Sequence, residues 1–440
     1  VTSGIVHIAI LQGKSDGQFT IERDPGTRIC KKTIRGFADR AAKPGAPLNQ
    51  QRLERAVLLI NDLPGISAKA SLTTGSTPGS TSIRLDVSEG PLLSGSAWTD
   101  NQGNRYTGAW RGNARLVVND PFGCGDQYTL LLTGAEGIAQ GRIGYRFPIT
   151  CDGLKGNLAY TGMGYIIVEG DAVNLQPKGQ SHSIDAGVTY PLLRSRATNI
   201  TTTAGYQFKT LSDRSAGETI SDKRLHSGSF GLGGDRFDTL LGGGYGSWSI
   251  SITAGSLHQE IADASSPNTD GAFMHFNTGL SRLQRLADRL TIALSWNAQH
   301  SLDNLDSSEK FYLGGPYGVR AYPVGEASGD EGHLFNIDLR YELPIPAAIG
   351  AVQLSGFYDA GRIRLHKDPW INSVSTATGI NEYWLQGAGI GLDYTSGNSF
   401  SLKATWAHAI GANGGRDTNG NNVDGKGSDN RFWLNASFYF

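Results

Sequence analysis

Residues 200–209 read ITTTAGYQFK, and this stretch shows the pattern on which the fold assignment depends. In an extended strand its side chains alternate between two faces. One face carries Ile200, Thr202, Ala204, Tyr206 and Phe208, and the other carries Thr201, Thr203, Gln207 and Lys209. The first face suits lipid and the second an aqueous lumen, as in a transmembrane β-barrel. A soluble β-sandwich also alternates, so one strand does not separate the two folds.

The same alternation recurs along most of the chain. About sixteen segments of this kind follow one another between Leu92 and Phe440. Short turns at 121–126 and 396–398 alternate with longer polar loops at 301–332 and 413–430. Short periplasmic turns and long external loops are typical of outer-membrane barrels. The sequence therefore predicts a mainly β fold, with a 16-stranded antiparallel transmembrane β-barrel over residues 91–440.

The last segment favours the barrel over the sandwich. One face of it carries Phe432, Leu434, Ala436, Phe438 and Phe440. A final aromatic residue on an alternating strand resembles the signal by which outer-membrane barrels are assembled. We therefore expect Phe440 to act as the assembly signal, with outer-membrane lipid and the barrel-assembly machinery as partners.

Composition supports many strands and turns and excludes some functions. The 440 residues include 60 Gly, 16 Tyr, 16 Phe and 8 Trp, and only 18% are charged. The formal net charge is −1, so the chain lacks the cationic field that nucleic-acid binding needs, and no nucleic-acid partner is expected. No apolar run approaches the ~20 residues of a transmembrane helix. A membrane would be crossed by strands.

The first 90 residues have a different pattern. Strands are predicted at 6–10, 19–22, 68–73 and 81–88, and helices at 28–39 and after Asn49, which is a typical N-cap residue. In the second helix Leu53, Ala56, Val57 and Ile60 recur at helical spacing. The order indicates a compact α+β module before the barrel.

No constellation for chemistry stands out. The G-x-S-x-G match at 13–17 lies between two short strands rather than before a helix, and no G-x-G-x-x-G opens a helix. The nine histidines are scattered, and the Asp- and Asn-rich stretch 417–429 has Asn422 and Ser428 where a calcium loop needs Gly and Glu. We expect no catalytic residue, no metal site, no cofactor and no enzymatic activity.

Three cysteines, Cys30, Cys124 and Cys151, form no CxxC pair. Cys124 and Cys151 fall in successive turns that we assign to the periplasm. Because that compartment is oxidising, we expect a disulfide between them.

A loop segment at 311–322, FYLGGPYGVRAY, is unusually apolar for an external loop. Because exposed apolar side chains are costly, we expect it to pack into the barrel lumen, where Arg320 would need an anion. Alternation over residues 351–362 places Asp359 on the lumen face, within reach of a bidentate pair with Arg320. Alternation alone leaves open that the two are separate surface charges.

These segments resemble the two-partner secretion transporters, the TpsB family, which are relatives of the BamA barrel-assembly proteins. The family's VRGY-type loop motif corresponds here to Gly318, Val319, Arg320, Ala321 and Tyr322. Its F-x-D-x-G wall motif corresponds to Phe357, Asp359 and Gly361. The resemblance implies that the loop at about 301–333 folds inward and that Arg320 pairs with Asp359.

One position departs from the family pattern, since Ala321 replaces the usual Gly. If that Gly needed a positive φ, Ala would strain the loop by roughly 1 kcal/mol. If it needed only to be small, little would change.

The resemblance also implies a domain organisation. Residues 17–90 correspond to a second POTRA domain, and residues 1–16 to the end of the first with a linker. The family's plug helix and most of its first POTRA domain are expected to lie outside this chain, which we expect to be processed or truncated.

The implied function is type V secretion across a Gram-negative outer membrane, with the POTRA domain in the periplasm. The chain would recognise an unfolded partner exoprotein, which carries an N-terminal secretion domain, and thread it through the barrel. An alternative is a BamA-like assembly and insertion factor. The cargo class, whether haemolysin, adhesin, haem scavenger or contact-dependent toxin, stays open.

Overall fold

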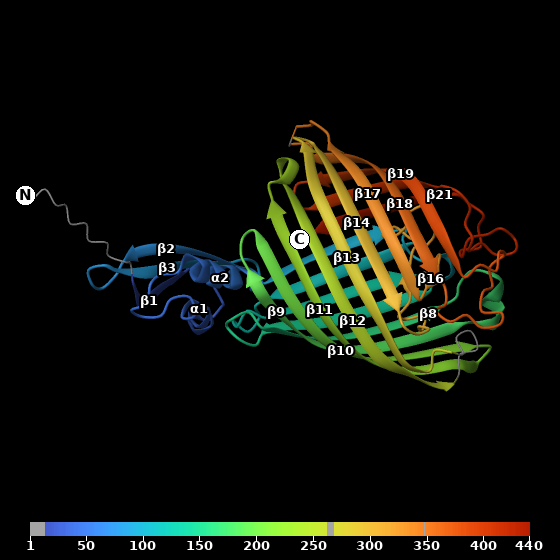
Figure 1. Ribbon diagram of the computed structural model, residues 1–440, viewed down its shortest axis with the longest axis horizontal. Helices are drawn as coiled ribbons and strands as arrows, with labels where there is room; N and C mark the ends of the chain where they lie inside the picture. Colours follow the sequence, from blue (N-terminus) through green and yellow to red (C-terminus); the bar gives the residue numbers. More distant parts are fainter. Residues whose placement is uncertain (1–13, 262–267, 347) are drawn as a thin grey trace, which may run out of the picture.

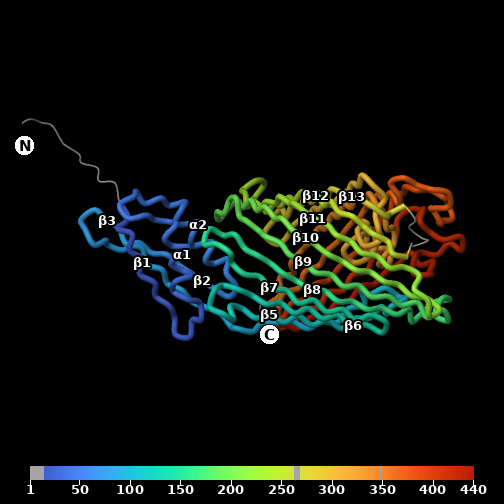
Figure 2. The backbone as a smooth tube through the Cα atoms, turned by 90° about the horizontal axis from the view of Figure 1, so that it is seen from below, coloured from blue at the N-terminus to red at the C-terminus, as the bar shows by residue number. Residues whose placement is uncertain are grey.

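The computed structural model describes residues 14–261, 268–346 and 348–440. A small N-terminal module and a large barrel lie end to end along the long axis of the molecule (Figures 1 and 2). Within the described residues, neither helix of the module nor any other helix is long and apolar enough to cross a membrane.

The N-terminal module is a three-stranded sheet covered by two helices. Its elements are β1 (Lys14–Arg23), α1 (Lys31–Ala38), α2 (Gln50–Asn61), β2 (Ile66–Thr74) and β3 (Ser80–Glu89). The sheet order is β1-β3-β2, with β1 parallel and β2 antiparallel to β3. The Asn49 side chain accepts a hydrogen bond from the Arg52 N–H at 3.0 Å and caps α2. Apolar side chains between helices and sheet form the core, among them Ile34, Phe37, Leu59, Ile60, Ile83 and Leu85.

The predicted order of elements in the module is confirmed, with two differences in boundaries. β1 begins at Lys14 and not at Phe19, because Lys14 and Ser15 pair with β3 on the far side of a register shift. The sheet therefore includes residues that the sequence placed in the linker. α1 is shorter than predicted, since the N–H groups of Arg28 and Ile29 bond to the Glu89 carboxylate. The strand predicted at 6–10 lies outside the described residues.

The predicted 16-stranded antiparallel barrel is confirmed. Its strands are β4 (Leu93–Asp100), β5 (Arg111–Asn119), β6 (Gln127–Ala135), β7 (Ile138–Pro148), β8 (Lys155–Ile166), β9 (Lys178–Arg194), β10 (Thr198–Ser215), β11 (Glu218–Asp238), β12 (Gly244–Ile261), β13 (Gly271–Ala287), β14 (Leu290–Ser301), β17 (Glu331–Glu342), β18 (Ala351–Arg364), β19 (Glu382–Ser396), β20 (Phe400–Ala409) and β21 (Asn430–Tyr439). β21 pairs with β4 and closes the barrel, so no strand edge is left open.

Alternation along the strands separates an outer face from a lumen face. On β10 the Lys209 ammonium points inward and contacts Glu309 of the loop that follows β14, at 2.9 Å. The neighbours Tyr206 and Phe208 therefore face outward, and Tyr206 is half exposed. Phe230 on β11 and Ile250 on β12 continue this exposed apolar outer surface. A barrel with an apolar outside and a polar inside is built to be surrounded by lipid.

Candidate functional site

The loop between β14 and β17, residues 302–330, folds into the barrel and is called the inward loop below. It contains a short hairpin, β15 (Phe311–Tyr312) with β16 (Ser328–Gly329). Apolar side chains of the loop and of the lumen wall share one buried cluster, formed by Leu313, Val319, Ala321, Tyr322, Ala327, Leu334, Phe357, Ile363, Leu385 and Ala407. Apolar contact thus keeps this loop inside the barrel, as its sequence predicted.

Arg320 lies at the tip of the inward loop between two carboxylates of the wall. Its Nη2 is 2.7 Å from Asp359 Oδ1 and its Nε is 2.8 Å from Asp359 Oδ2, a bidentate pair. Its Nη1 is 2.8 Å from Asp338 Oδ1 on the neighbouring strand β17. The Asp359 side chain is fully buried and that of Arg320 is 12% exposed. The structure therefore brings Arg320 and Asp359 together and adds Asp338 to the pair.

Further contacts fix the position of the guanidinium. Its Cζ lies 3.5 Å from the centre of the Phe357 ring, within the range of a cation–π contact. The Asn336 amide donates to Asp359 Oδ1 at 2.8 Å and to the Gly318 carbonyl at 3.0 Å. The Trp433 indole N–H, from the last strand, donates to the Arg320 carbonyl at 2.8 Å. Side chains of β17, β18 and β21 thus hold the same loop tip.

The two motif glycines are explained by close approach of the loop. A Cβ on Gly318 would overlap the carbonyl oxygen of Leu313 across the tight turn. A Cβ on Gly361, on the barrel wall, would lie 2.5 Å from Leu313 Cδ2. A larger residue at Gly361 would push the loop away from the wall, and one at Gly318 would distort the turn within the loop.

Ala321 fits its place without backbone strain. It is fully buried, and it is not one of the described residues with a positive φ. Room for its methyl group comes from Gly387 on β19, where a Cβ would lie 2.5 Å from that of Ala321. The structure therefore supports limited space, and not a positive φ, as the reason for a small residue at position 321.

The first part of the inward loop is held by other strands. Asp306 is 2.7 Å from Lys223 on β11, with both side chains almost fully buried, and Glu309 is 2.9 Å from Lys209 on β10. The buried Glu326, near the loop's end, accepts from the Asn413 amide at 2.6 Å. The loop therefore spans the lumen from β10 and β11 to β17 and β18. Removing one partner of a buried ion pair typically costs about 3–5 kcal/mol, so these contacts resist displacement.

Sequence reasoning missed Asn336, Asp338, Trp433 and Gly387. The first two had a usable signal, since the alternation that placed Asp359 in the lumen also places Asn336 and Asp338 on the inner face of β17. Nothing in the local sequence of Trp433 indicated that its N–H would reach a loop 113 residues earlier.

Phe440, the predicted assembly signal, lies at the seam of the barrel. Its N–H and C=O exchange hydrogen bonds with Gly95 at 3.0 and 2.9 Å. It therefore extends the pairing of β21 with β4 by one residue, and its side chain stays largely exposed on the outer face.

The predicted disulfide between Cys124 and Cys151 is wrong for this structure. All three cysteines lie in the described residues and all are free thiols. The Cys124 thiol donates to Asp126 Oδ1 at 3.3 Å, and burial, together with that carboxylate, raises its pKa to about 11. Cys151 instead packs against the module, 2.5 Å from where a Cβ on Gly36 would stand. Turns that are successive in sequence meet different parts of the module, which keeps these two apart.

The module is joined to the barrel by polar contacts from α2. The Asp62 carboxylate at its C-terminal end forms a bidentate pair with Arg194 at 2.8 and 2.9 Å. The Lys155 ammonium donates to the Asp62 carbonyl at 2.9 Å, and the Arg55 guanidinium donates to the Pro191 carbonyl at 2.7 Å. Contacts with two neighbouring strands, β8 and β9, fix the orientation of the module at this end of the barrel (Figure 1).

Asp120, in the turn after β5 at this junction, is expected to make stability depend on pH. Burial is the main cause that raises its pKa from 3.8 to about 6, and the nearby carboxylates of Glu89 and Asp126 add to it. Between about pH 4 and pH 6 the Asp120 carboxyl therefore keeps a proton in the folded state that it releases in the unfolded state. The stability from this proton is complete below about pH 4 and is lost as pH rises through about 6.

We expect Asp120→Asn to raise the unfolding temperature near pH 8 and to change it little near pH 4.5. Asn tolerates the φ of 49° at this position. The measurement is the temperature at which the barrel loses its folded electrophoretic mobility, at one heating rate. An identical pH dependence in both proteins would contradict the assignment.

Comparison with known proteins shows which protein family this chain resembles. Residues 79–393 match the family model of the haemolysin secretion/activation proteins ShlB/FhaC/HecB. The chain is 28% identical over 447 residues to the heme/hemopexin transporter protein HuxB of Haemophilus influenzae, covering 99% of this chain and 75% of HuxB. It is 23% identical over 415 residues to the outer membrane transporter CdiB of Escherichia coli, covering 90% of this chain and 66% of CdiB.

Solved structures share the fold. CdiB from Escherichia coli superposes with a TM-score of 0.79 at 19% identity, over 98% of this chain and 77% of CdiB. BamA from Haemophilus ducreyi lacking POTRA domains 1–3 gives a TM-score of 0.62 at 14% identity, over 96% of this chain and 84% of that one. The family match covers most of the barrel, including the inward loop and both motifs. The chain belongs to the ShlB/FhaC/HecB family of haemolysin secretion/activation proteins, outer-membrane transporters of two-partner secretion.

Proposed function

We propose that this chain receives an unfolded partner exoprotein in the periplasm through its N-terminal module, a POTRA domain, and threads it through the barrel to the cell surface. The observation that carries the proposal is the inward loop, which Arg320 holds across the lumen by ion pairs with Asp359 and Asp338. A loop that apolar contact and ion pairs hold inside a 16-stranded barrel would open the lumen to an extended chain once those contacts rearrange. Residues 17–90 are the second POTRA domain in this proposal, and residues 1–16 end the first.

The free edge of β2 is the proposed entry point for the partner. The Asn61 side chain bonds to both the N–H and the C=O of Ala68, at 2.6 and 3.0 Å, so these groups point away from β3. By the alternation of antiparallel pairing, the backbone groups of Ala70, Leu72 and Thr74 point the same way. In the part of the chain that the structure describes, nothing pairs with them.

An extended segment of the partner would add a strand at this edge. Three residues with free N–H and C=O groups offer six hydrogen bonds, each with a net value of about 0.5–1.5 kcal/mol. Such binding recognises the backbone of the partner and depends little on its side chains, which suits an unfolded chain. The energy for passage would come from folding of the partner outside the cell.

The competing proposal, an assembly factor that opens its barrel sideways, is favoured by one observation. β21 and β4 share only five residue pairs, the fewest between neighbouring strands of the barrel. A barrel that opens laterally would open there. Threading through the lumen needs no such opening.

A disulfide across the seam separates the two mechanisms. We expect Ser96→Cys with Tyr439→Cys, which are register partners, to leave secretion of the co-expressed partner within about twofold of wild type when oxidised. The native cysteines are replaced by Ser beforehand, and the partner is measured outside the cell. Secretion that stops on oxidation and returns on reduction would favour lateral opening. A chain lacking residues 302–330 serves as the defective control.

A further inference from the structure

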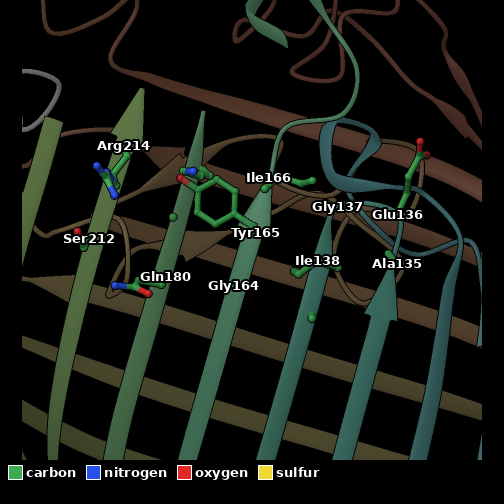
Figure 3. A pocket seen from close by; sticks show the side chains of 13 residues that line it. Ala135, Glu136, Gly137, Ile138, Gly164, Tyr165, Ile166, Gln180, Ser212 and Arg214 are labelled. Carbon is green, nitrogen blue, oxygen red and sulfur yellow. The ribbon is translucent and has the colours of Figure 1, made fainter. Parts of the chain in front are cut away.

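A pocket of about 500 Å³ lies on the wall of the barrel at the extracellular ends of β6 to β10 (Figure 3). Its position relative to the membrane follows from the strand register. Lys209 points into the lumen, so Ser212 and Arg214 point outward by alternation. Their partners across the β9 pairing, Gln180 and Lys178, share that outer face. The pocket is therefore open to the lipid side of the barrel.

Two cations border the pocket without a carboxylate partner among the described residues. Lys178 and Arg214 are direct register partners on β9 and β10, and both are exposed. The Arg214 Nη2 donates only to the Gly217 carbonyl, at 3.0 Å. By contrast Arg224, an outward residue of β11 near the same end, forms an ion pair with Glu260 at 2.7 Å. Like charges side by side on neighbouring strands repel, so an anion between them would be stabilising.

The carboxylates near the pocket do not serve as that anion. Asp213 points inward and accepts a hydrogen bond from the Tyr165 hydroxyl at 2.7 Å. Glu136 stands at the opposite side of the pocket from Arg214, with its carboxylate directed away from the strands (Figure 3). Asp222, the β11 partner of Ser212, makes no ion pair with either cation. The positive charge of Lys178 and Arg214 is left for a bound group.

On the membrane side of the two cations, Gly164 forms the floor of the pocket. Gly164, the partner of Gln180, faces outward, and a Cβ there would meet nothing nearer than the Gly179 carbonyl at 4.0 Å. Further along, the Tyr160 hydroxyl bonds to the His182 ring at 2.8 Å on the same outer face. Such amphipathic pairs are typical of the membrane interface. The floor of the pocket at Gly164 therefore carries no side chain and leaves space on the lipid side of the strand.

Distance places the cations at the level of lipid head groups. Lys178 lies four residues beyond His182, about 13 Å along the strand. A strand tilt of about 35–45° reduces this to roughly 10 Å above the interface. Phosphorylated sugars of an outer-leaflet glycolipid occupy that depth.

We propose that this pocket binds the phosphorylated head group of an outer-leaflet glycolipid, with Lys178 and Arg214 on a phosphate and one acyl chain over Gly164. The site goes beyond export of a partner, since it fixes one rim of the barrel to the membrane. Charge-assisted hydrogen bonds from a guanidinium and an ammonium give the phosphate its affinity, and the apolar floor selects a lipid over a free ion.

The test uses the purified chain in nanodiscs of neutral phospholipid, with deep-rough lipopolysaccharide as the probe and retention measured by native mass spectrometry. Lys178→Gln with Arg214→Gln is expected to weaken binding about tenfold, because both phosphate contacts are lost. Arg224→Gln is the matched control, since it removes an outward Arg of the same rim whose charge is already paired, and it should stay within about twofold. Equal loss in both variants, or loss in neither, overturns the proposal.

A second variant tests the acyl contact independently of charge. Gly164→Leu places a side chain on the floor at a position where a Cβ has room, and it is expected to weaken binding several-fold. Removing the phosphates from the probe should lower retention by wild type to that of the Gln variants. If inorganic phosphate at millimolar concentration displaces the lipid fully, the site is a phosphate site and the lipid assignment is wrong.

Discussion

Replacing Arg320 with alanine is expected to cut secretion of the partner exoprotein at least about tenfold while the barrel stays folded. The substitution leaves Asp359 buried without its cation and Asp338 without a partner for its carboxylate. A buried charge that loses its partner costs about 3–5 kcal/mol, and that cost falls on the inward position of the loop. The barrel itself is closed by pairing of all its strands and does not depend on this residue. Two quantities are measured in the same cells: the amount of partner outside the cells, and the fraction of barrel that keeps the heat-dependent electrophoretic mobility of a folded barrel.

Two further variants show which property of Arg320 matters. Arg320→Lys keeps the charge but loses the planar fork that bonds to Asp359 and Asp338 together, so we expect secretion between those of wild type and the alanine variant. Arg362→Ala is the matched control, because Arg362 also pairs with a carboxylate, Glu382, but on the outer face. Normal export by Arg320→Ala, or an equal defect in Arg362→Ala, would remove the proposed role.

Leu72→Pro is expected to weaken binding of the partner's secretion domain about tenfold or more. Proline has no N–H and its ring obstructs a strand approaching the β2 edge, so at least one of the proposed hydrogen bonds is lost and its neighbours are displaced. The Leu72 N–H points away from β3, so pairing inside the module is kept. Binding is measured by titration of the purified chain with the N-terminal secretion domain of the candidate partner exoprotein.

Leu72→Ala is the control for this experiment. It removes the same exposed side chain but keeps the N–H, so an effect of proline that alanine does not share belongs to the backbone. If both variants bind equally weakly, the partner recognises the Leu72 side chain. If both bind like wild type, the β2 edge is not the entry point.

Much of the fold could be predicted from the sequence because it depends on patterns among residues that are close in the chain. Alternation in segments such as residues 200–209 and the spacing of turns predicted the 16-stranded barrel. The Asn49 cap and helical spacing predicted α2. Neither depends on which segments meet in space, so a single chain was sufficient.

The candidate site was predicted in part. Alternation placed Asp359 in the lumen and apolar content placed the inward loop there, which made their pairing possible but not required. Three other features of the site depend on strands far apart in sequence. These are the second carboxylate, Asp338, the hydrogen bond from the Trp433 indole, and the space that Gly387 leaves for Ala321. The wrong disulfide has the same cause, since sequence proximity of Cys124 and Cys151 does not report where neighbouring turns lie around the barrel rim.

The sequence by itself determined that residues 91–440 form a barrel with a polar lumen and an inward loop, because side-chain periodicity and turn chemistry are local properties of a chain. Only the tertiary structure decided how that loop is held. Arg320 meets two carboxylates and an aromatic ring because β17 and β18 are neighbours in the barrel, and the Trp433 indole reaches the same loop tip from β21, farther around the closed wall. Closure brings together residues more than a hundred positions apart, and no local pattern encodes that neighbourhood.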